Sequence, residues 1–101
     1  MSAAKVKAQG IINDNAVVVF SKSYCPYCTA SKKLLKDLKA NYIAVELDNE
    51  SDGSAIQNAL EEITGQRTVP NIFIKQQHIG GNSDLQARKD LPALLKAADA
   101  L

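Results

Sequence analysis

Ser23-Tyr24-Cys25-Pro26-Tyr27-Cys28 contains both cysteines of this chain and decides how its neighbours fold. An apolar, β-branched run, Ala16-Val17-Val18-Val19-Phe20, precedes this stretch and has the length of a strand. Residues 29–39 follow it and carry leucines at helical spacing. The two cysteines are therefore predicted at a strand-to-helix turn.

Each cysteine has a defined position in the predicted helix. Cys25 is expected at the N-cap and Pro26 at the first helical position, where a missing N–H costs nothing. Cys28 then lies one turn inside the helix. A helix start offers unpaired N–H groups and the positive end of the macrodipole, which favour the thiolate that attacks disulfides. Lys22, just upstream, either adds positive charge here or is an ordinary solvated lysine.

Three interpretations of the cysteine pair compete. A structural disulfide is disfavoured because so short a loop constrains the unfolded chain little. Structural zinc is disfavoured because it needs four Cys or His ligands, and the chain adds only His78 to the two thiols. We therefore predict a reversible dithiol, with Cys25 attacking and Cys28 resolving, and we expect no metal site.

Length and charge narrow the class of protein. Residues 1–101 are predicted as a single domain, since a chain of 101 residues has room for one core. With 12 basic and 11 acidic residues, the net charge is +1, and no basic run is long enough to follow nucleic acid. No segment approaches the ~20 apolar residues of a membrane helix, and residues 1–7 lack the apolar core of a secretory signal. We expect a cytoplasmic monomer, in a compartment that keeps thiols reduced.

The remaining segments predict an α/β fold. The expected elements are a helix from Ser2 to about Asn13, strands at 17–20 and 42–47, a helix through Ile56 and Ile63 stopped by Gly65, a hairpin of strands 71–74 and 77–79, and a last helix from Asp90. Val6, Ile11 and Ile12 are expected on the apolar side of the first helix, Tyr24 in packing, and Ser51 or Asp52 as a cap of the helix through Ile56. Together these segments predict a four-stranded mixed sheet flanked by helices on both faces. Cys25 lies at the edge where ligands gather.

Two further motifs have both a functional and a simpler interpretation. In Thr68-Val69-Pro70, proline restrains Val69 towards extended geometry and leaves its main chain free to pair with a ligand. An ordinary strand-start proline is simpler, since only about 5–6% of X-Pro bonds are cis. Gly80-Gly81-Asn82-Ser83-Asp84 permits close backbone approach and offers N–H groups to a carboxylate, or is a plain hairpin exit.

In this order and spacing, the three motifs resemble those of the dithiol glutaredoxins. Cys25-Pro26-Tyr27-Cys28, Thr68-Val69-Pro70 and Gly80-Gly81-Asn82-Ser83-Asp84 carry the resemblance, which covers essentially the whole chain. Thioredoxins usually have Trp-Cys-Gly-Pro-Cys at the active site, whereas this chain has no tryptophan. The resemblance implies a thioredoxin-like fold that binds glutathione, with the proline of the second motif cis and facing the sulfurs.

The resemblance also implies which residues bind glutathione. They are Lys22, Cys25, Tyr27, Gln66, Thr68, Val69, Pro70, Gly81, Ser83 and Asp84. Lys22 and Gln66 would hold the glycine carboxylate, and Val69 would pair with the cysteine main chain. Ser83 and Asp84 would take the γ-glutamyl end. An extended zwitterionic tripeptide needs this pattern of a cation, a strand-like edge and an acid.

The predicted activity is glutathione-dependent reduction of disulfide-containing or glutathionylated proteins. Cys25 attacks, and Cys28 or free glutathione resolves the mixed disulfide. Two rivals are a thioredoxin-like reductase served by a flavoprotein and a [2Fe–2S] module shared by two protomers. The glycine pair and Asp84 disfavour the first, and Pro26 disfavours the second by family pattern. His78 is expected in a surface or packing role.

Overall fold

The computed structural model describes residues 2–101, which form five α-helices, one 3-10 turn and four β-strands. In chain order, the elements are α1 Ala3–Asp14, β1 Val17–Ser21, α2 Pro26–Asp37, β2 Ile43–Glu46, the 3-10 turn η1 Leu47–Asn49, α3 Gly53–Thr64, β3 Asn71–Ile74, β4 Gln77–Gly80, α4 Asn82–Ala87 and α5 Leu91–Ala97. Every element that the sequence predicts is present, with ends that differ by a few residues.

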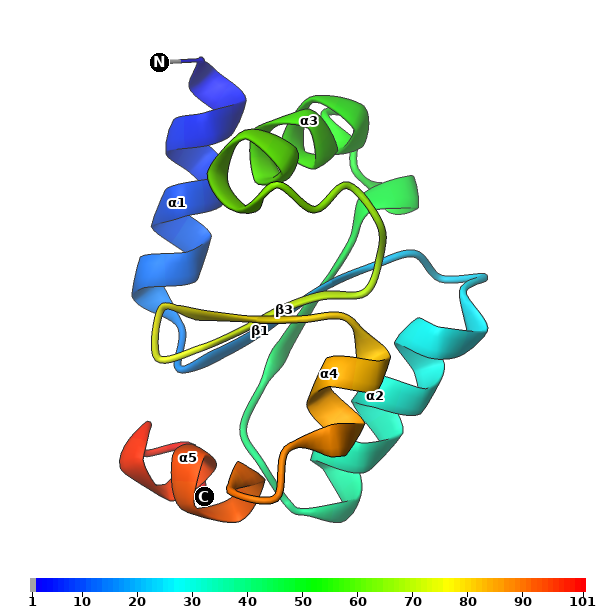
Figure 1. The fold of residues 1–101 in the computed structure, drawn as a ribbon. Helices are drawn as coiled ribbons and strands as arrows, with labels where there is room; N and C mark the ends of the chain where they lie inside the picture. The colour runs from blue at the N-terminus through cyan, green and yellow to red at the C-terminus, as the bar shows by residue number, and fades with distance from the viewer. Residues whose placement is uncertain (1) are drawn as a thin grey trace.

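The four strands form one mixed sheet in the order β2-β1-β3-β4. β1 and β2 are parallel because α2 joins them as a crossover, and β3 runs antiparallel to both β1 and β4. In Figure 1, α1 and α3 lie on one side of the sheet, and α2, α4 and α5 lie on the other. The predicted four-stranded mixed sheet with helices on both faces is confirmed.

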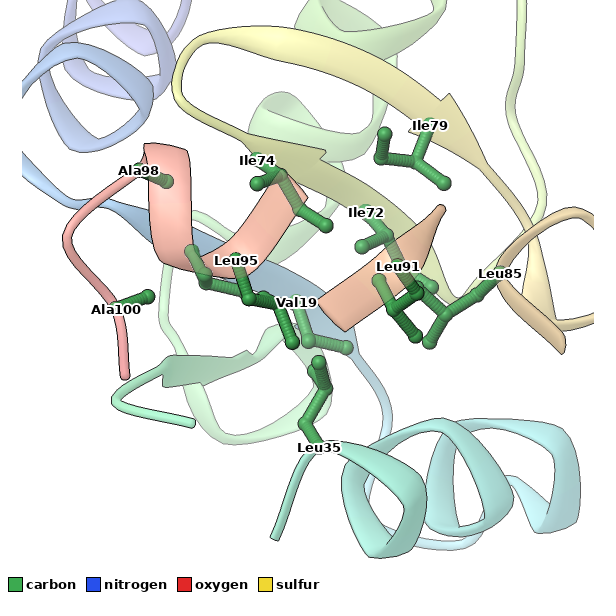
Figure 2. Close-up of a cluster of buried hydrophobic side chains, with 11 residues drawn as sticks. Val19, Leu35, Ile72, Ile74, Ile79, Leu85, Leu91, Leu95, Ala98 and Ala100 are labelled. Atoms are coloured by element: carbon green, nitrogen blue, oxygen red, sulfur yellow. The ribbon is translucent and has the colours of Figure 1, made fainter. Parts of the chain in front are cut away.

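Side-chain alternation along the central strand divides the interior into two cores. Val17 and Val19 of β1 face α2, α4 and α5, whereas Val18 and Phe20 face α1 and α3. Figure 2 shows the first core, in which aliphatic side chains from β3 and from α5 point toward Val19. All five residues of β1 are buried. The strand that precedes the cysteines is therefore held from both faces.

The junction between β2 and α3 depends on a glycine. A Cβ at Gly53 would lie 1.8 Å from the carbonyl oxygen of Leu47, so only glycine lets α3 begin against η1. Asp52 occupies the predicted N-cap position, but its side chain makes no cap hydrogen bond and instead accepts from Lys7 Nζ at 2.9 Å. Gly65 ends α3 with φ of +80°, as predicted.

One prediction for the first helix is wrong. Val6 is 56% exposed, although its spacing suggested the apolar side of α1. The prediction for Ile12 is confirmed, since Ile12 is buried. Ala8 is buried as well, because α1 packs closely on α3 through a face that includes this small residue. The spacing of apolar residues along a helix does not show which of two adjacent rows of side chains a neighbouring helix will cover.

Candidate active site

Cys25 lies at the start of α2, as the sequence predicts. It is the N-cap residue with extended geometry, and Pro26 occupies the first helical position. The Sγ of Cys25 accepts the backbone N–H of Cys28 at 3.2 Å. The first turn of α2 therefore presents a main-chain donor to the Cys25 sulfur.

The turn that delivers Cys25 is anchored by Asp48, which follows β2. Asp48 accepts hydrogen bonds from the backbone N–H of Ser23 at 2.9 Å and from the Ser23 hydroxyl. These bonds hold the pKa of Asp48 below its ordinary value of 3.8, and the charge of Lys22 acts in the same direction. This role of Asp48 was not predicted from the sequence. Its one available signal was an acidic residue at the carboxyl end of a strand parallel to β1.

Cys28 occupies a different environment one turn further along. Cys28, Ser31 and Leu35 recur at helical spacing on the buried face of α2, so the second thiol points inward and is 0% exposed. Burial raises the pKa of Cys28, and the hydrogen bond with Cys25 raises it further. The buried Ser21 hydroxyl acts on this pKa in the opposite direction. Cys28 is thus a buried thiol, with a pKa above its ordinary value, next to the partly exposed Cys25.

The Thr68-Val69-Pro70 segment lies beside Cys25. The Val69–Pro70 peptide bond is cis, as the resemblance implied, so the simpler interpretation of an ordinary trans bond is wrong. The Cys25 Sγ lies 3.9 Å from the Val69 carbonyl oxygen, across 44 positions of sequence. Pro70 is buried, and Val69 is partly exposed. Main chain with unused hydrogen-bonding capacity therefore borders the reactive sulfur.

The glycine motif lies next to this segment. A Cβ on Gly81 would be 3.8 Å from the Pro70 carbonyl oxygen, so the backbones of the two motifs run close together. Gly80 has φ of +116°, and a Cβ there would lie 2.3 Å from Asp84 Oδ2. Asp84 Oδ2 accepts the backbone N–H of Gly81 at 2.9 Å, and α4 begins at Asn82. The two glycines thus let an exposed carboxylate fold back beside the Pro70 turn.

The remaining predicted site residues surround these groups. Thr68, Tyr27 and Ser83 are exposed, and Tyr27 is 70% accessible beside the cysteines. Tyr24 is 71% exposed, so its predicted packing role is wrong. Lys22 lines a polar pocket of about 210 Å³ together with Tyr24.

The side-chain amide of Gln66 forms hydrogen bonds within its own loop. Its side-chain amide donates to the Thr68 carbonyl at 3.1 Å and to the Pro70 carbonyl at 3.0 Å. Both hydrogens of the amide are therefore used within the loop. His78 is exposed, and its ring packs on Phe73 with centroids 5.2 Å apart, in agreement with its predicted surface or packing role.

Residues 2–101 contain neither a metal-binding cluster nor a membrane-spanning helix. Within residues 2–101, no group of three or more His, Cys, Asp or Glu side chains is arranged to hold a metal ion. Over the same range, no helix combines the length and the apolar character needed to cross a membrane.

A dithiol at a helix start that faces a cis-proline turn, on a sheet of this topology, defines a thioredoxin-like thiol–disulfide oxidoreductase. The family model described as glutaredoxin matches residues 17–79. The chain therefore belongs to the glutaredoxin family, whose members are thiol–disulfide oxidoreductases.

Individual relatives agree with this assignment. A glutaredoxin of Ricinus communis is 61% identical over 85 residues, covering 84% of this chain and 83% of the relative. Glutaredoxin-C2 of Arabidopsis thaliana is 55% identical over 101 residues, covering 97% of this chain and 91% of the relative. The crystal structure of a buckwheat glutaredoxin–glutathione complex is similar, with a TM-score of 0.95 at 50% identity. It covers 97% of this chain and 92% of that chain.

Proposed function

We propose that this protein uses glutathione to reduce protein disulfides and glutathione mixed disulfides through Cys25 and Cys28. The contact that carries the proposal is the Cys28 N–H donated to Cys25 Sγ at 3.2 Å, beside the Val69 carbonyl at 3.9 Å. It combines a stabilised nucleophilic sulfur with a main-chain edge for the tripeptide whose thiol the sulfur must meet.

Deglutathionylation needs only the first cysteine. The Cys25 thiolate attacks the glutathione sulfur of a mixed disulfide, the protein thiolate leaves and takes up a proton, and Cys25 carries glutathione as a new disulfide. A second glutathione thiolate then attacks the glutathione sulfur of that disulfide. Oxidised glutathione leaves, and the Cys25 thiolate is restored.

Reduction of a protein disulfide uses both cysteines. Cys25 attacks one sulfur of the substrate and releases the other as a thiolate. Cys28 then gives up its proton and attacks Cys25, which forms the Cys25–Cys28 disulfide and frees the second substrate thiol. Two glutathione molecules supply the two electrons that reduce this disulfide. The buried position of Cys28, directly behind Cys25, suits an internal attack.

We propose that glutathione lies along the Val69 turn and the glycine motif. Val69 pairs with the cysteine main chain, and the other residues in contact with the tripeptide there are Tyr27, Thr68, Pro70 and Gly81. Ser83 and Asp84 take the γ-glutamyl end, where Asp84 supplies the negative charge. In support, Gly81 approaches Pro70 closely, and the buckwheat relative was solved as a complex with glutathione.

At the opposite end of glutathione, Lys22 supplies the charge for the glycine carboxylate. Gln66 contributes by holding the turn, since both of its amide hydrogens are used there. Each exposed charge contact is worth about 0–1 kcal/mol, so affinity arises from several modest contacts held in one geometry.

Mass spectrometry of the Cys28→Ser protein treated with oxidised glutathione tests the nucleophile and the ligand together. We expect one glutathione adduct, located on Cys25 by peptide mapping. The Cys25→Ser protein serves as the control and should carry none. An adduct on Cys28 alone, or no adduct in either protein, would overturn the proposal.

The charge contacts are tested by steady-state kinetics. Lys22→Gln and Asp84→Asn should each raise the KM for glutathione about two- to fivefold with little change in kcat. Lys33→Gln is the matched control, because Lys33 is an exposed lysine of α2 paired with Asp37 at 2.7 Å. An equal effect of Lys33→Gln would remove the argument for Lys22.

We further propose that residues 1–101 form one glutaredoxin domain that acts as a monomer on cytoplasmic proteins. In support, the chain has only the two cysteines of the active-site pair and hence no scaffold of structural disulfides, and both cores share one sheet. Sedimentation of the reduced protein tests the monomer, and imaging of a fluorescent fusion tests the location. A dimer, or a signal confined to an organelle, would contradict these two statements.

A further inference from the structure

Asn71 is a buried polar residue next to the turn along which glutathione is proposed to bind. It is the first residue of β3, it follows Pro70, and it is 1% exposed. Its backbone pairs with Phe20 of β1, so its side chain lies among the residues of the α1 and α3 core. A buried amide is costly unless it is hydrogen-bonded, which directs attention to its partners.

Both ends of the Asn71 amide are bonded. Its Nδ2 donates to the Gln66 carbonyl at 3.3 Å, and its Oδ1 lies 2.8 Å from His78 Nε2. Because a carbonyl can only accept, the first bond fixes which amide atom faces His78. The Asn71 oxygen must then accept, so Nε2 of His78 carries the proton.

Side-chain amides donate hydrogen bonds to most of the backbone carbonyls in the turn from Gln66 to Pro70. The Gln66 carbonyl accepts from Asn71, and the Arg67 carbonyl accepts from Gln57 Nε2 at 2.8 Å. The carbonyls of residues 68 and 70 accept from the Gln66 amide at 3.1 and 3.0 Å. Four of the five carbonyls are thus held by side-chain amides.

Val69 is the exception within this turn. Its carbonyl has no amide partner in the hydrogen bonds described for residues 2–101 and instead faces the Cys25 sulfur at 3.9 Å. When Cys25 ionises or forms a disulfide, it has no S–H to donate, and the Val69 carbonyl becomes available. The amide side chains therefore hold every carbonyl of the turn except the one beside the nucleophile.

We infer that Asn71 is a positioning residue that holds the Gln66–Pro70 turn so that the Val69 main chain stays aligned for glutathione. The inference rests on the proposed function, because it assumes that Val69 pairs with the tripeptide. Asn71 reaches the ligand only through the turn, and its bonds include none to Cys25 or Cys28. Its loss should therefore weaken glutathione binding and leave the nucleophile intact.

Steady-state kinetics of Asn71→Ala provide the main test. We expect the KM for glutathione to rise about fivefold, the effect of one lost neutral hydrogen bond, with kcat nearly unchanged. The rate of iodoacetamide alkylation at Cys25 should stay the same. A role in stability alone would not produce this separation, because a fraction of unfolded protein lowers the apparent kcat without changing KM.

Two further variants make the test decisive. Asn71→Asp has nearly the same shape and still accepts from His78, but it has no hydrogen to donate to Gln66, so its KM should also rise. Asn15→Ala is the matched control, since Asn15 Nδ2 donates to the Ile11 carbonyl at 2.9 Å before the opposite end of β1. Its KM should stay at the value of the unaltered protein.

The NMR signals of His78 report on its hydrogen bond with Asn71. His78 is the only histidine in the chain, so its ring protons are assigned without ambiguity. In Asn71→Ala, the Nε2–H resonance should broaden or shift as the bond is lost, while in Asn15→Ala it should be unaltered.

An unchanged KM in both Asn71 variants would overturn the inference, as would an equal rise in Asn15→Ala. If the Cys28→Ser protein forms no glutathione adduct, the proposed function fails and the inference fails with it. If the adduct forms and the KM values do not separate, only the inference fails.

Discussion

Cys25 and Cys28 are the same residue type, three positions apart on one helix, yet their surroundings differ in almost every respect. Cys25 caps the helix, is partly exposed and accepts an N–H. Cys28 is fully buried, and burial raises its pKa. The difference supports the proposed roles, in which Cys25 attacks and Cys28 resolves, because one turn of helix changes the surroundings of a sulfur. The helix start supplies donors, and the inner face supplies a dry environment.

The largest expected effect on activity comes from replacing each cysteine in turn, which tests the comparison between Cys25 and Cys28. Cys25→Ser should lose both activities by at least about 10³-fold, because a hydroxyl is a poor substitute for the thiolate. Cys28→Ser should keep deglutathionylation and lose the two-thiol reduction of protein disulfides. A glutathionylated peptide and an insoluble disulfide protein serve as the two substrates. Equal loss of deglutathionylation in both variants would reject the assigned roles.

Alkylation compares the two sulfurs without mutation. At neutral pH, iodoacetamide should modify Cys25 at least about tenfold faster than Cys28, because thiolate character and exposure both favour Cys25. Peptide mapping at short times measures the two rates. In concentrated urea the ratio should approach one, which would show that the difference comes from the fold. A native ratio near one would contradict the comparison.

Ser21 offers a way to sharpen the contrast at Cys28 alone. The Ser21 hydroxyl opposes the rise in the Cys28 pKa, so Ser21→Ala should raise that pKa further. Resolution through Cys28 should slow about two- to fivefold, while deglutathionylation is unaffected. Ser51→Ala, which removes an exposed hydroxyl, is the control. Slowing of both activities would show that Ser21 acts on packing instead.

The smallest expected effect concerns the turn that holds Cys25. The folded-state pKa of Asp48 lies below 3.8, so the unfolded state binds more protons in the interval between the two values. The stabilisation that the charged Asp48 provides is therefore present above the ordinary pKa of 3.8. It is lost as the pH falls through the lower pKa that Asp48 has in the folded protein. Asp48→Asn should lower the urea midpoint slightly at neutral pH, and the difference should narrow at about pH 3. A difference that widens in acid would contradict this role.

Much of the site near Cys25 was predictable because its interactions are local. Proline after Cys25 suits the first helical position, and Cys28 supplies the N–H that reaches the sulfur three residues back. The same holds for Gly65, whose positive φ ends α3. The continuous β-branched, apolar run at 17–20 also predicted a strand, although it left open which core each side chain would join.

The sequence by itself determined the dithiol, its helix start and the order of elements, since these depend on residues within a few positions of one another. Only the tertiary structure decided that Val69 lies against Cys25, that Asn71 joins Gln66 to His78, and that Tyr24 is exposed. These contacts join segments brought together by the sheet and by two packed cores. The patterns along a single strand or helix do not contain that information.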